Sequence, residues 1–174
     1  MKQIFTLIFL CCSLSFLEGQ NNLFVPFGQT TEQVKNFLYA KEYVTAVQED
    51  DSLHSVRAYL DKNKHVEYAF ENGALYATTV TRNYAEKRAA ATVQKNCMEY
   101  MQVISRGSVS ITTNENVTCY TAITDSRIIK LFVRLHKKGS TLTLTAVSRH
   151  YGPMVLDDNF HYEVELLQEK FISN

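Results

Sequence analysis

Five consecutive residues near the end of the last clear strand pattern carry the side chains that most often build binding or reaction sites. The run Arg149-His150-Tyr151-Gly152-Pro153 places a cation, an imidazole and a phenol before a rigid turn. Loops at strand ends are common functional sites because a rigid scaffold positions them. The run therefore predicts a binding site at Arg149, His150 and Tyr151. The same residues would form the site of a hydrolase if a carboxylate or second histidine lay within hydrogen-bond reach of His150. A strand that simply ends in a turn explains the same residues.

The remaining polar residues do not form a recognisable reaction motif. The chain contains no metalloprotease helix motif, nucleophile elbow, phosphate-binding loop or dinucleotide fingerprint. Its five histidines are scattered, one to an element. The acidic runs Glu49-Asp50-Asp51 and Asp157-Asp158 lack the alternating ligand spacing of a calcium loop. We therefore expect no metal, no cofactor and no catalytic activity.

Tyrosine is the more informative residue type. The chain has 10 Tyr, 10 Phe and no Trp. Tyr59, Tyr76 and Tyr120 fall out of phase with the apolar positions of their predicted strands, which predicts that they lie on an outward sheet face. Tyrosine is enriched at protein interfaces, although its ordinary strand propensity accounts for the same positions.

These residues favour a module that binds a protein partner through a Tyr-bearing sheet face. The aromatic content also fits a second function, the carriage of a small apolar ligand in a cavity between the sheet and a helix over residues 84–104.

The first 19 residues have the pattern of a secretory signal peptide. Lys2 precedes an apolar run from Ile4 that is too short to span a bilayer comfortably, and cleavage is expected between Gly19 and Gln20. An uncleaved anchor is the alternative. This predicts a secreted, periplasmic or cell-envelope protein with a single domain over residues 20–174. No further apolar run has membrane length, so no membrane span is expected after cleavage.

Charge argues against one class of partner. The chain has 18 basic and 18 acidic residues, and the predicted leader removes one of each, Lys2 and Glu18. A neutral chain lacks the clustered cations that displace counterions from nucleic acid. We therefore expect no nucleic-acid partner.

Two cysteines remain after the predicted leader, Cys97 and Cys119. In an oxidising compartment a single pair has one intramolecular connectivity, which predicts a Cys97–Cys119 disulfide. Two buried free thiols are the alternative. The run Asn116-Val117-Thr118 fits a glycosylation site if the host is eukaryotic.

The periodicity of the first half predicts a helix followed by four strands. Thr30 and Gln33 fit a capping box, and Val34, Phe37 and Leu38 share one face of the helix that follows. Alternation then predicts strands over 44–48, 53–60, 66–70 and 75–82. The Asn72-Gly73 pair predicts a type I′ hairpin between the last two strands.

The second half repeats this order. An apolar stripe that includes Ala90, Cys97 and Met101 predicts a helix over 84–104, and strands are expected over 109–113, 117–124, 127–136 and 142–149. Residues 157–171 fit either a helix or a strand, and we adopt the helix. The helical face consists of Phe160, Val164, Leu167 and Phe171, and the strand face of Phe160, Tyr162, Val164 and Leu166.

Together these elements predict an α+β fold. We expect a two-layer sandwich in which an antiparallel sheet of about eight strands carries helices on one face. The order is helix, four strands, helix, four strands and a terminal helix, with possible sub-repeats at 30–83 and 84–150.

The run from Phe27 to Leu38 resembles the entry helix of SmpA/OmlA-type envelope domains, which have a glycine, a capping hydroxyl, an acidic residue and an apolar stripe. The element order also resembles the tandem α/β repeat of the β-lactamase inhibitor protein family. The chain lacks the lipobox cysteine of the first family and has about twice its number of strands. The resemblance therefore implies only a fold, in which a sheet covered on one face binds protein with the other.

Overall fold

The computed structural model describes residues 25–149, which form two helices and eight strands. In chain order they are α2 (Thr31–Tyr39), β1 (Ala46–Asp50), β2 (Ser55–Asp61), β3 (Lys64–Glu71), β4 (Ala74–Tyr84), α3 (Lys87–Ile104), β5 (Val109–Asn114), β6 (Val117–Ile123), β7 (Arg127–Leu135) and β8 (Ser140–Ser148). The predicted order of helix, four strands, helix and four strands is confirmed. The predicted leader and the predicted terminal helix lie outside the described residues.

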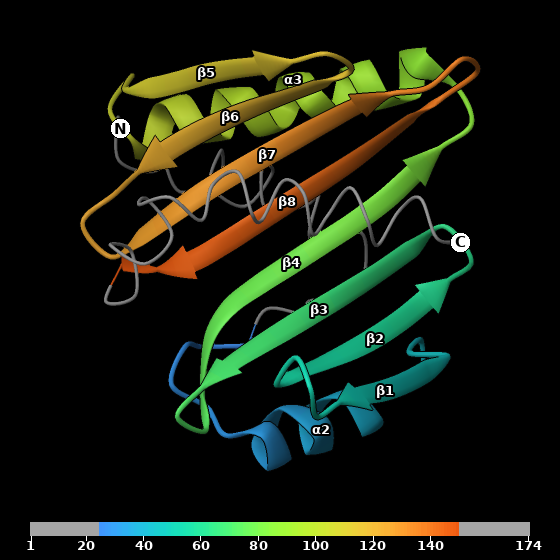
Figure 1. Cartoon of the computed structure of the whole chain (residues 1–174), viewed down its shortest axis with the longest axis vertical. Helices are drawn as coiled ribbons and strands as arrows, with labels where there is room; N and C mark the ends of the chain where they lie inside the picture. Colours follow the sequence, from blue (N-terminus) through green and yellow to red (C-terminus); the bar gives the residue numbers. More distant parts are fainter. Residues whose placement is uncertain (1–24, 150–174) are drawn as a thin grey trace, which may run out of the picture.

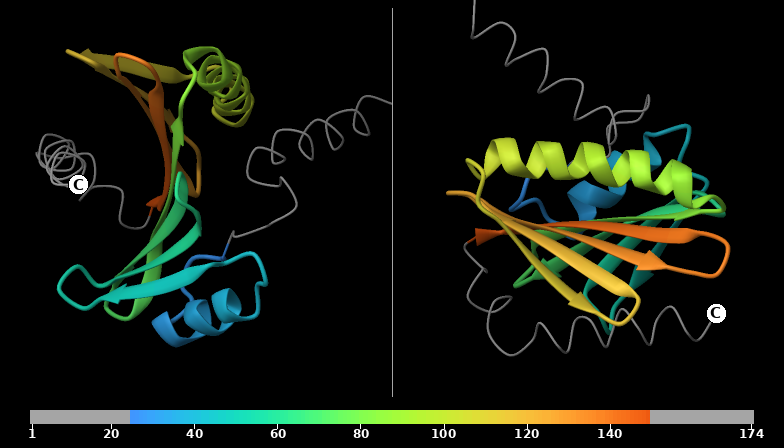
Figure 2. Two further views of the ribbon diagram at one scale, coloured as in Figure 1. Left: turned by 90° about the vertical axis from the view of Figure 1, so that its right-hand side faces the viewer. Right: turned by 90° about the horizontal axis from the view of Figure 1, so that it is seen from above.

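All eight strands belong to one antiparallel sheet in the order β1-β2-β3-β4-β8-β7-β6-β5. Each half of the chain forms a meander of four strands, and the halves join where β4 pairs with β8 (Figure 1). Both helices lie on the same side of the sheet (Figure 2). No helix between residues 25 and 149 is long and apolar enough to cross a membrane.

Helix α2 begins at the predicted capping box. The Thr30 backbone amide donates to Gln33 Oε1 over 2.9 Å, and the Gln33 amide donates to Thr30 Oγ1 over 3.3 Å. Its apolar face buries Val34 and Leu38 against β2 and β3, where Val56 and Tyr68 are also fully buried. Burial of this stripe attaches the helix to the first half of the sheet.

Helix α3 covers the second half in the same way. Its buried residues Ala90, Cys97 and Met101 pack against β6, β7 and β8, on side chains that include Leu131 and Leu142. The apolar stripe that the sequence periodicity predicts on α3 is thus the face of the helix that packs on the sheet.

The Asn72-Gly73 hairpin is also confirmed. Asn72 has φ of 52° and Gly73 of 77°, the left-handed values that a type I′ turn requires at both central positions. This turn fixes the pairing register of β3 and β4. A register slip of one residue would move the side chains of a strand to the opposite face of the sheet, so the turn also decides which of them face the helices.

The other side of the sheet, whose strand side chains point away from α2 and α3, is called the far face here. Side chains alternate along a strand, so the register assigns each residue to one face. On β7, Ile129, Leu131 and Val133 pack under α3, whereas Ile128, Lys130 and Phe132 belong to the far face.

The predicted Cys97–Cys119 disulfide is wrong. Both cysteines are buried free thiols. Cys97 is on the buried face of α3, whereas Cys119 is on β6 next to Tyr120, whose hydroxyl accepts a hydrogen bond of 2.8 Å from Gln94 of α3. Since Tyr120 points toward α3, Cys119 points to the far face. The sheet therefore lies between the two thiols.

Candidate functional site

The far face of β1, β2 and β3 carries a compact set of polar and aromatic side chains. This set, called the polar patch below, consists of Gln48, Arg57, Tyr59, His65 and Glu67. The strand register brings them together, because Gln48 stands opposite Arg57, Arg57 opposite Glu67, and Tyr59 opposite His65. Cross-strand neighbours of this kind have Cβ atoms about 5 Å apart, within reach of long side chains.

Short contacts hold the patch residues in place. Arg57 Nη2 lies 2.8 Å from Glu67 Oε2, and the Tyr59 hydroxyl donates to Gln48 Oε1 over 3.1 Å. The rings of Tyr59 and His65 are tilted by 43° with their centroids 5.8 Å apart. A tyrosine and an arginine fixed in this way lose little side-chain entropy when they bind a partner.

The surroundings also tune the charges of the patch. Burial disfavours the Arg57 charge, but hydrogen bonds with Tyr59 and Glu67 outweigh this effect, so the pKa of Arg57 is raised. Burial and the nearby Arg57 cation together lower the pKa of His65, against a smaller opposing effect of Glu67. The patch thus presents a firmly charged guanidinium beside an imidazole that resists protonation.

A hollow adjoins the polar patch on the β1–β2 hairpin. It has a volume of about 430 Å³ and is lined by Gln48, Glu49, Asp50, Asp51, Ser55 and Arg57. Three of these side chains are carboxylates and one is a guanidinium, and Glu49 is also paired with Lys35 of α2, whose Nζ lies 2.7 Å from Glu49 Oε2. A cationic side chain of a partner is therefore the best electrostatic fit for this hollow.

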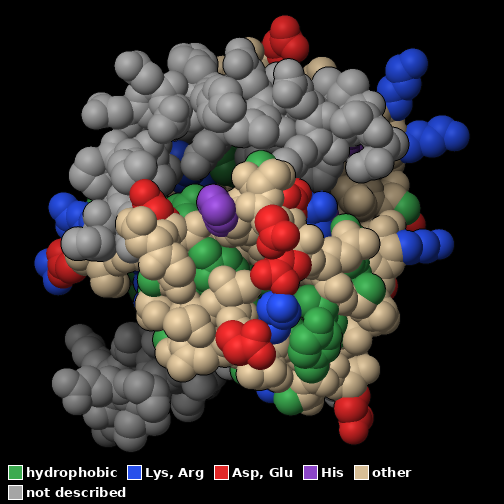
Figure 3. Space-filling view, turned by 60° about the horizontal axis from the view of Figure 1, so that its bottom comes forward, with side chains coloured by type: hydrophobic (Ala, Val, Ile, Leu, Met, Phe, Trp, Pro, Cys, Tyr) green, Lys and Arg blue, Asp and Glu red, His purple; other side chains and the backbone are tan. Residues whose placement is uncertain are grey.

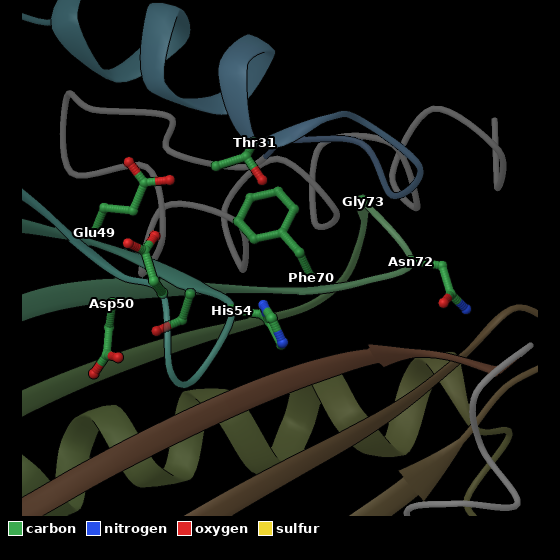
Figure 4. Close-up of a pocket in the computed structure, with 9 residues that line it drawn as sticks. Thr31, Glu49, Asp50, His54, Phe70, Asn72 and Gly73 are labelled. Atoms are coloured by element: carbon green, nitrogen blue, oxygen red, sulfur yellow. The ribbon is translucent and has the colours of Figure 1, made fainter.

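A second hollow, of about 320 Å³, shares the same acidic residues. Figure 4 shows the Phe70 ring directed toward Thr31 at the start of α2, with Glu49 and Asp50 across the opening. Acidic side chains gather on this end of the molecule (Figure 3). The hairpin turn itself is fixed by Asp50, whose carboxylate accepts from the Ser52 hydroxyl and the Leu53 amide over 2.6 and 3.1 Å.

The predicted tyrosines do not share one surface. Tyr59 is half-buried on the far face and belongs to the polar patch. Tyr76 lies where the β3–β4 register shifts, and it packs beside Ala77 and Val147. Tyr120 lies under α3, where it packs in the apolar cluster. The structure therefore separates Tyr120 from the outward face on which the sequence pattern placed it.

The predicted site at the end of β8 is only partly described. Arg149 is exposed, and its guanidinium donates to the Thr124 carbonyl over 3.2 Å while its amide donates to Ser126 over 3.0 Å. His150 and Tyr151 lie outside the described residues. The described contacts of Arg149 fasten β8 to the β6–β7 turn.

Sequence reasoning did not find Gln48, Arg57, His65 or Glu67 as site residues. The turn Asp61-Lys62-Asn63-Lys64 is visible in the sequence, but the strand register shifts between Tyr59 and Asp61. Counting outward from the Asp61–Lys64 pair would place Arg57 opposite Tyr68, whereas the shift pairs Arg57 with Glu67. The cross-strand charge pair therefore cannot be read from the turn alone.

Neither hollow involves α3, since their lining residues come from α2 and from the β1–β2 and β3–β4 hairpins. Within residues 25–149, no group of three or more His, Cys, Asp or Glu side chains is arranged to hold a metal ion. Comparison with protein-family models, curated proteins and solved structures finds no match to this chain.

Proposed function

We propose that this protein is a non-catalytic, secreted or periplasmic module that binds a protein partner through the polar patch. The observation that carries the proposal is the placement of Tyr59 and Arg57. Both are fixed by neighbours, and both lie on the far face beside an acidic hollow. Tyrosine and arginine are the residue types most often found as binding hot spots.

The composition of the site supports this function. The patch joins tyrosine to arginine, two residue types in which protein interfaces are enriched. Carboxylates outnumber cations in the adjoining hollow even with Glu49 paired to Lys35, so the partner presents a lysine or arginine beside an apolar or aromatic group that packs on Tyr59. The predicted leader supplies the secreted or periplasmic location.

The test is affinity capture from an extract of the source cells, with the chain over residues 20–174 as bait. We expect a captured protein whose affinity falls in the Tyr59→Ala and Arg57→Ala variants by about 2 kcal/mol each, roughly 30-fold. Tyr39→Ala is the matched control, because Tyr39 is 66% exposed on α2, away from the far face. Equal capture by the Tyr59 and Tyr39 variants, with both still folded, contradicts the proposal.

A further inference from the structure

Strand β5 forms one edge of the sheet and has no described strand on its outer side (Figure 1). Residues Ser110 to Asn114 are exposed, and Ile111 retains 61% of its surface. Within residues 25–149, no backbone hydrogen bond reaches residues 109–114 from outside the β5–β6 ladder. The outer edge of β5 is therefore available to another strand.

This edge lacks the features that usually prevent pairing. Edge strands of natural proteins are protected by a charge, a proline, a bulge or a covering element. The sequence of β5, VSITTN, contains no charged residue and no proline, and four of its six residues are β-branched, the type that favours strands. Its register with β6 runs from Val109 to Asn114 without a shift, so β5 has no bulge.

The opposite edge strand, β1, differs from β5 in charge. Its sequence, AVQED, ends in two acidic residues, and Asp51 follows. Two copies of β1 in antiparallel contact would have carboxylates at both ends of the contact and no cation within either strand to balance them. Charge therefore disfavours self-association through β1 and leaves β5 as the edge that can pair with its own copy.

The geometry of the β5–β6 hairpin decides which backbone groups face the open edge. Asn114 and Val117 flank a two-residue turn and lie opposite each other in the register, so they exchange both backbone hydrogen bonds. Every second pair along the ladder does the same. The backbone groups of Val109, Ile111 and Thr113 therefore point away from β6, and a strand added at this edge must bond to them.

We propose that β5 pairs with β5 of a second copy of this chain, in antiparallel orientation about a twofold axis. Ile111 then lies opposite the second copy's Ile111, and Val109 lies opposite the second copy's Thr113. A twofold axis perpendicular to the sheet joins the two sheets into one and keeps both α3 helices on the same side. The inference does not rest on the polar patch, which belongs to the β1–β3 end of the sheet.

The charges that flank β5 agree with this pairing. The only charged residues from 105 to 117 are Arg106 before the strand and Glu115 after it, and both are exposed. Neither forms an ion pair with another residue of the described chain. About 30 Å of extended chain separates them within one copy, too far for an ion pair. In the proposed register Glu115 lies opposite the second copy's Gly107, next to its Arg106, so opposite charges meet at each end of the contact.

The test is the oligomeric state of the chain over residues 20–174. A contact of one short strand from each copy is smaller than a standard interface, so we expect a dissociation constant of about 10–100 µM. Sedimentation equilibrium at concentrations on either side of this range measures it, in dithiothreitol to prevent disulfide-linked dimers. Ile111→Lys places like charges opposite each other at the axis and should raise the dissociation constant at least about tenfold. Val103→Lys, at a position of α3 that is 56% exposed, is the matched control and should leave the dimer unchanged.

A second set of variants keeps the test decisive if Ile111→Lys fails to fold. Arg106→Glu and Glu115→Arg should each weaken the dimer about fivefold, because each brings like charges together, and the double variant should restore it. The proposal is overturned if the unaltered chain stays monomeric across the whole range. It is also overturned if a folded Ile111→Lys chain dimerises as the Val103→Lys chain does, or if the double variant dimerises no more tightly than the single ones.

Discussion

The free state of Cys97 and Cys119 follows from the direction of one side chain on β6. Neighbouring residues of a strand point to opposite faces of the sheet. Tyr120 points toward α3, so Cys119 beside it points away from Cys97. Burial raises the pKa of the Cys97 thiol to about 12, so it stays protonated and unreactive at neutral pH. The two thiols are thus separate apolar packing groups.

We therefore expect a reducing agent to leave the stability of residues 20–174 unchanged. A disulfide closing a loop of this size contributes about 3 kcal/mol in the chain-entropy description, so its loss would be easily seen. The measurement is urea unfolding with and without dithiothreitol. A lower midpoint in the reductant, restored when it is removed, would show that the thiols do pair.

His65 makes stability depend on pH in a defined direction. Its folded-state pKa lies below the ordinary value of 6.5 because of burial and Arg57, so the unfolded chain binds a proton more readily than the folded chain. The free energy of unfolding should therefore decrease as the pH falls through 6.5 toward the lowered pKa.

Urea unfolding at about pH 7.5 and about pH 5.5 tests this dependence, since the interval brackets histidine titration. His65→Asn should reduce the loss of stability at the lower pH. The control is His54→Asn, a turn residue with φ of 47° that asparagine tolerates. If the pH dependence of stability is the same in the His65→Asn variant, then the His65 imidazole of the unaltered chain has the same pKa in the folded and unfolded states.

At the scale of single elements, the capping box makes a measurable contribution to α2. Thr30→Ala removes the acceptor for the Gln33 amide and should destabilise the chain by about 1 kcal/mol. Thr92→Ala is the control, because the Thr92 hydroxyl only donates back to the Arg88 carbonyl within α3. Equal losses in the free energy of unfolding for the two variants would show that the Thr30 cap stabilises the chain no more than an ordinary helix hydroxyl does.

The β7–β8 turn is held against the start of α3. A Cβ atom added at Gly139 would overlap the backbone carbonyl oxygen of Tyr84, whereas one at Gly73 meets nothing within 4 Å. Gly73→Ala should cost only the left-handed strain, about 1 kcal/mol. Gly139→Ala should destabilise the chain by more than this, because the β7–β8 hairpin and the backbone of Tyr84, just before α3, must move apart. Thermal unfolding of the two variants gives the comparison, and a smaller effect at Gly139 contradicts this packing.

The sequence pattern predicted the elements well because each is a local property. The Asn72-Gly73 turn, the Thr30 cap and the Ala90–Met101 stripe each need only a few neighbouring residues. The faces of β6 could not be assigned in this way. Val117, Cys119 and Ile123 are more apolar as a set than Thr118 and Tyr120, yet the latter parity faces α3, where the Tyr120 hydroxyl accepts from Gln94, and Ile123 is 44% exposed.

The candidate site was predictable only in part for the same reason. Tyr59 is visible in the sequence as an outward tyrosine, but its partners Gln48 and His65 depend on the pairing of three strands. Register is a long-range property that a single strand does not encode.

At the scale of the whole molecule, one sheet joins two similar halves with different far faces. The halves meet at β4 and β8, where Thr79 and Thr145 hydroxyls lie 3.1 Å apart. The far face of β1 to β3 presents the polar patch, whereas the far face of the central strands carries buried side chains such as Ile128 and Phe132.

The most direct test of the proposed function is photocrosslinking from the patch in an extract of the source cells. A photoreactive phenylalanine analogue at position 59 is compared with the same analogue at the exposed position 39 of α2. The account predicts a discrete protein adduct from position 59 that is absent at position 39 and is lost when Arg57→Ala is added. No adduct at position 59, or the same adduct from both positions, would contradict it.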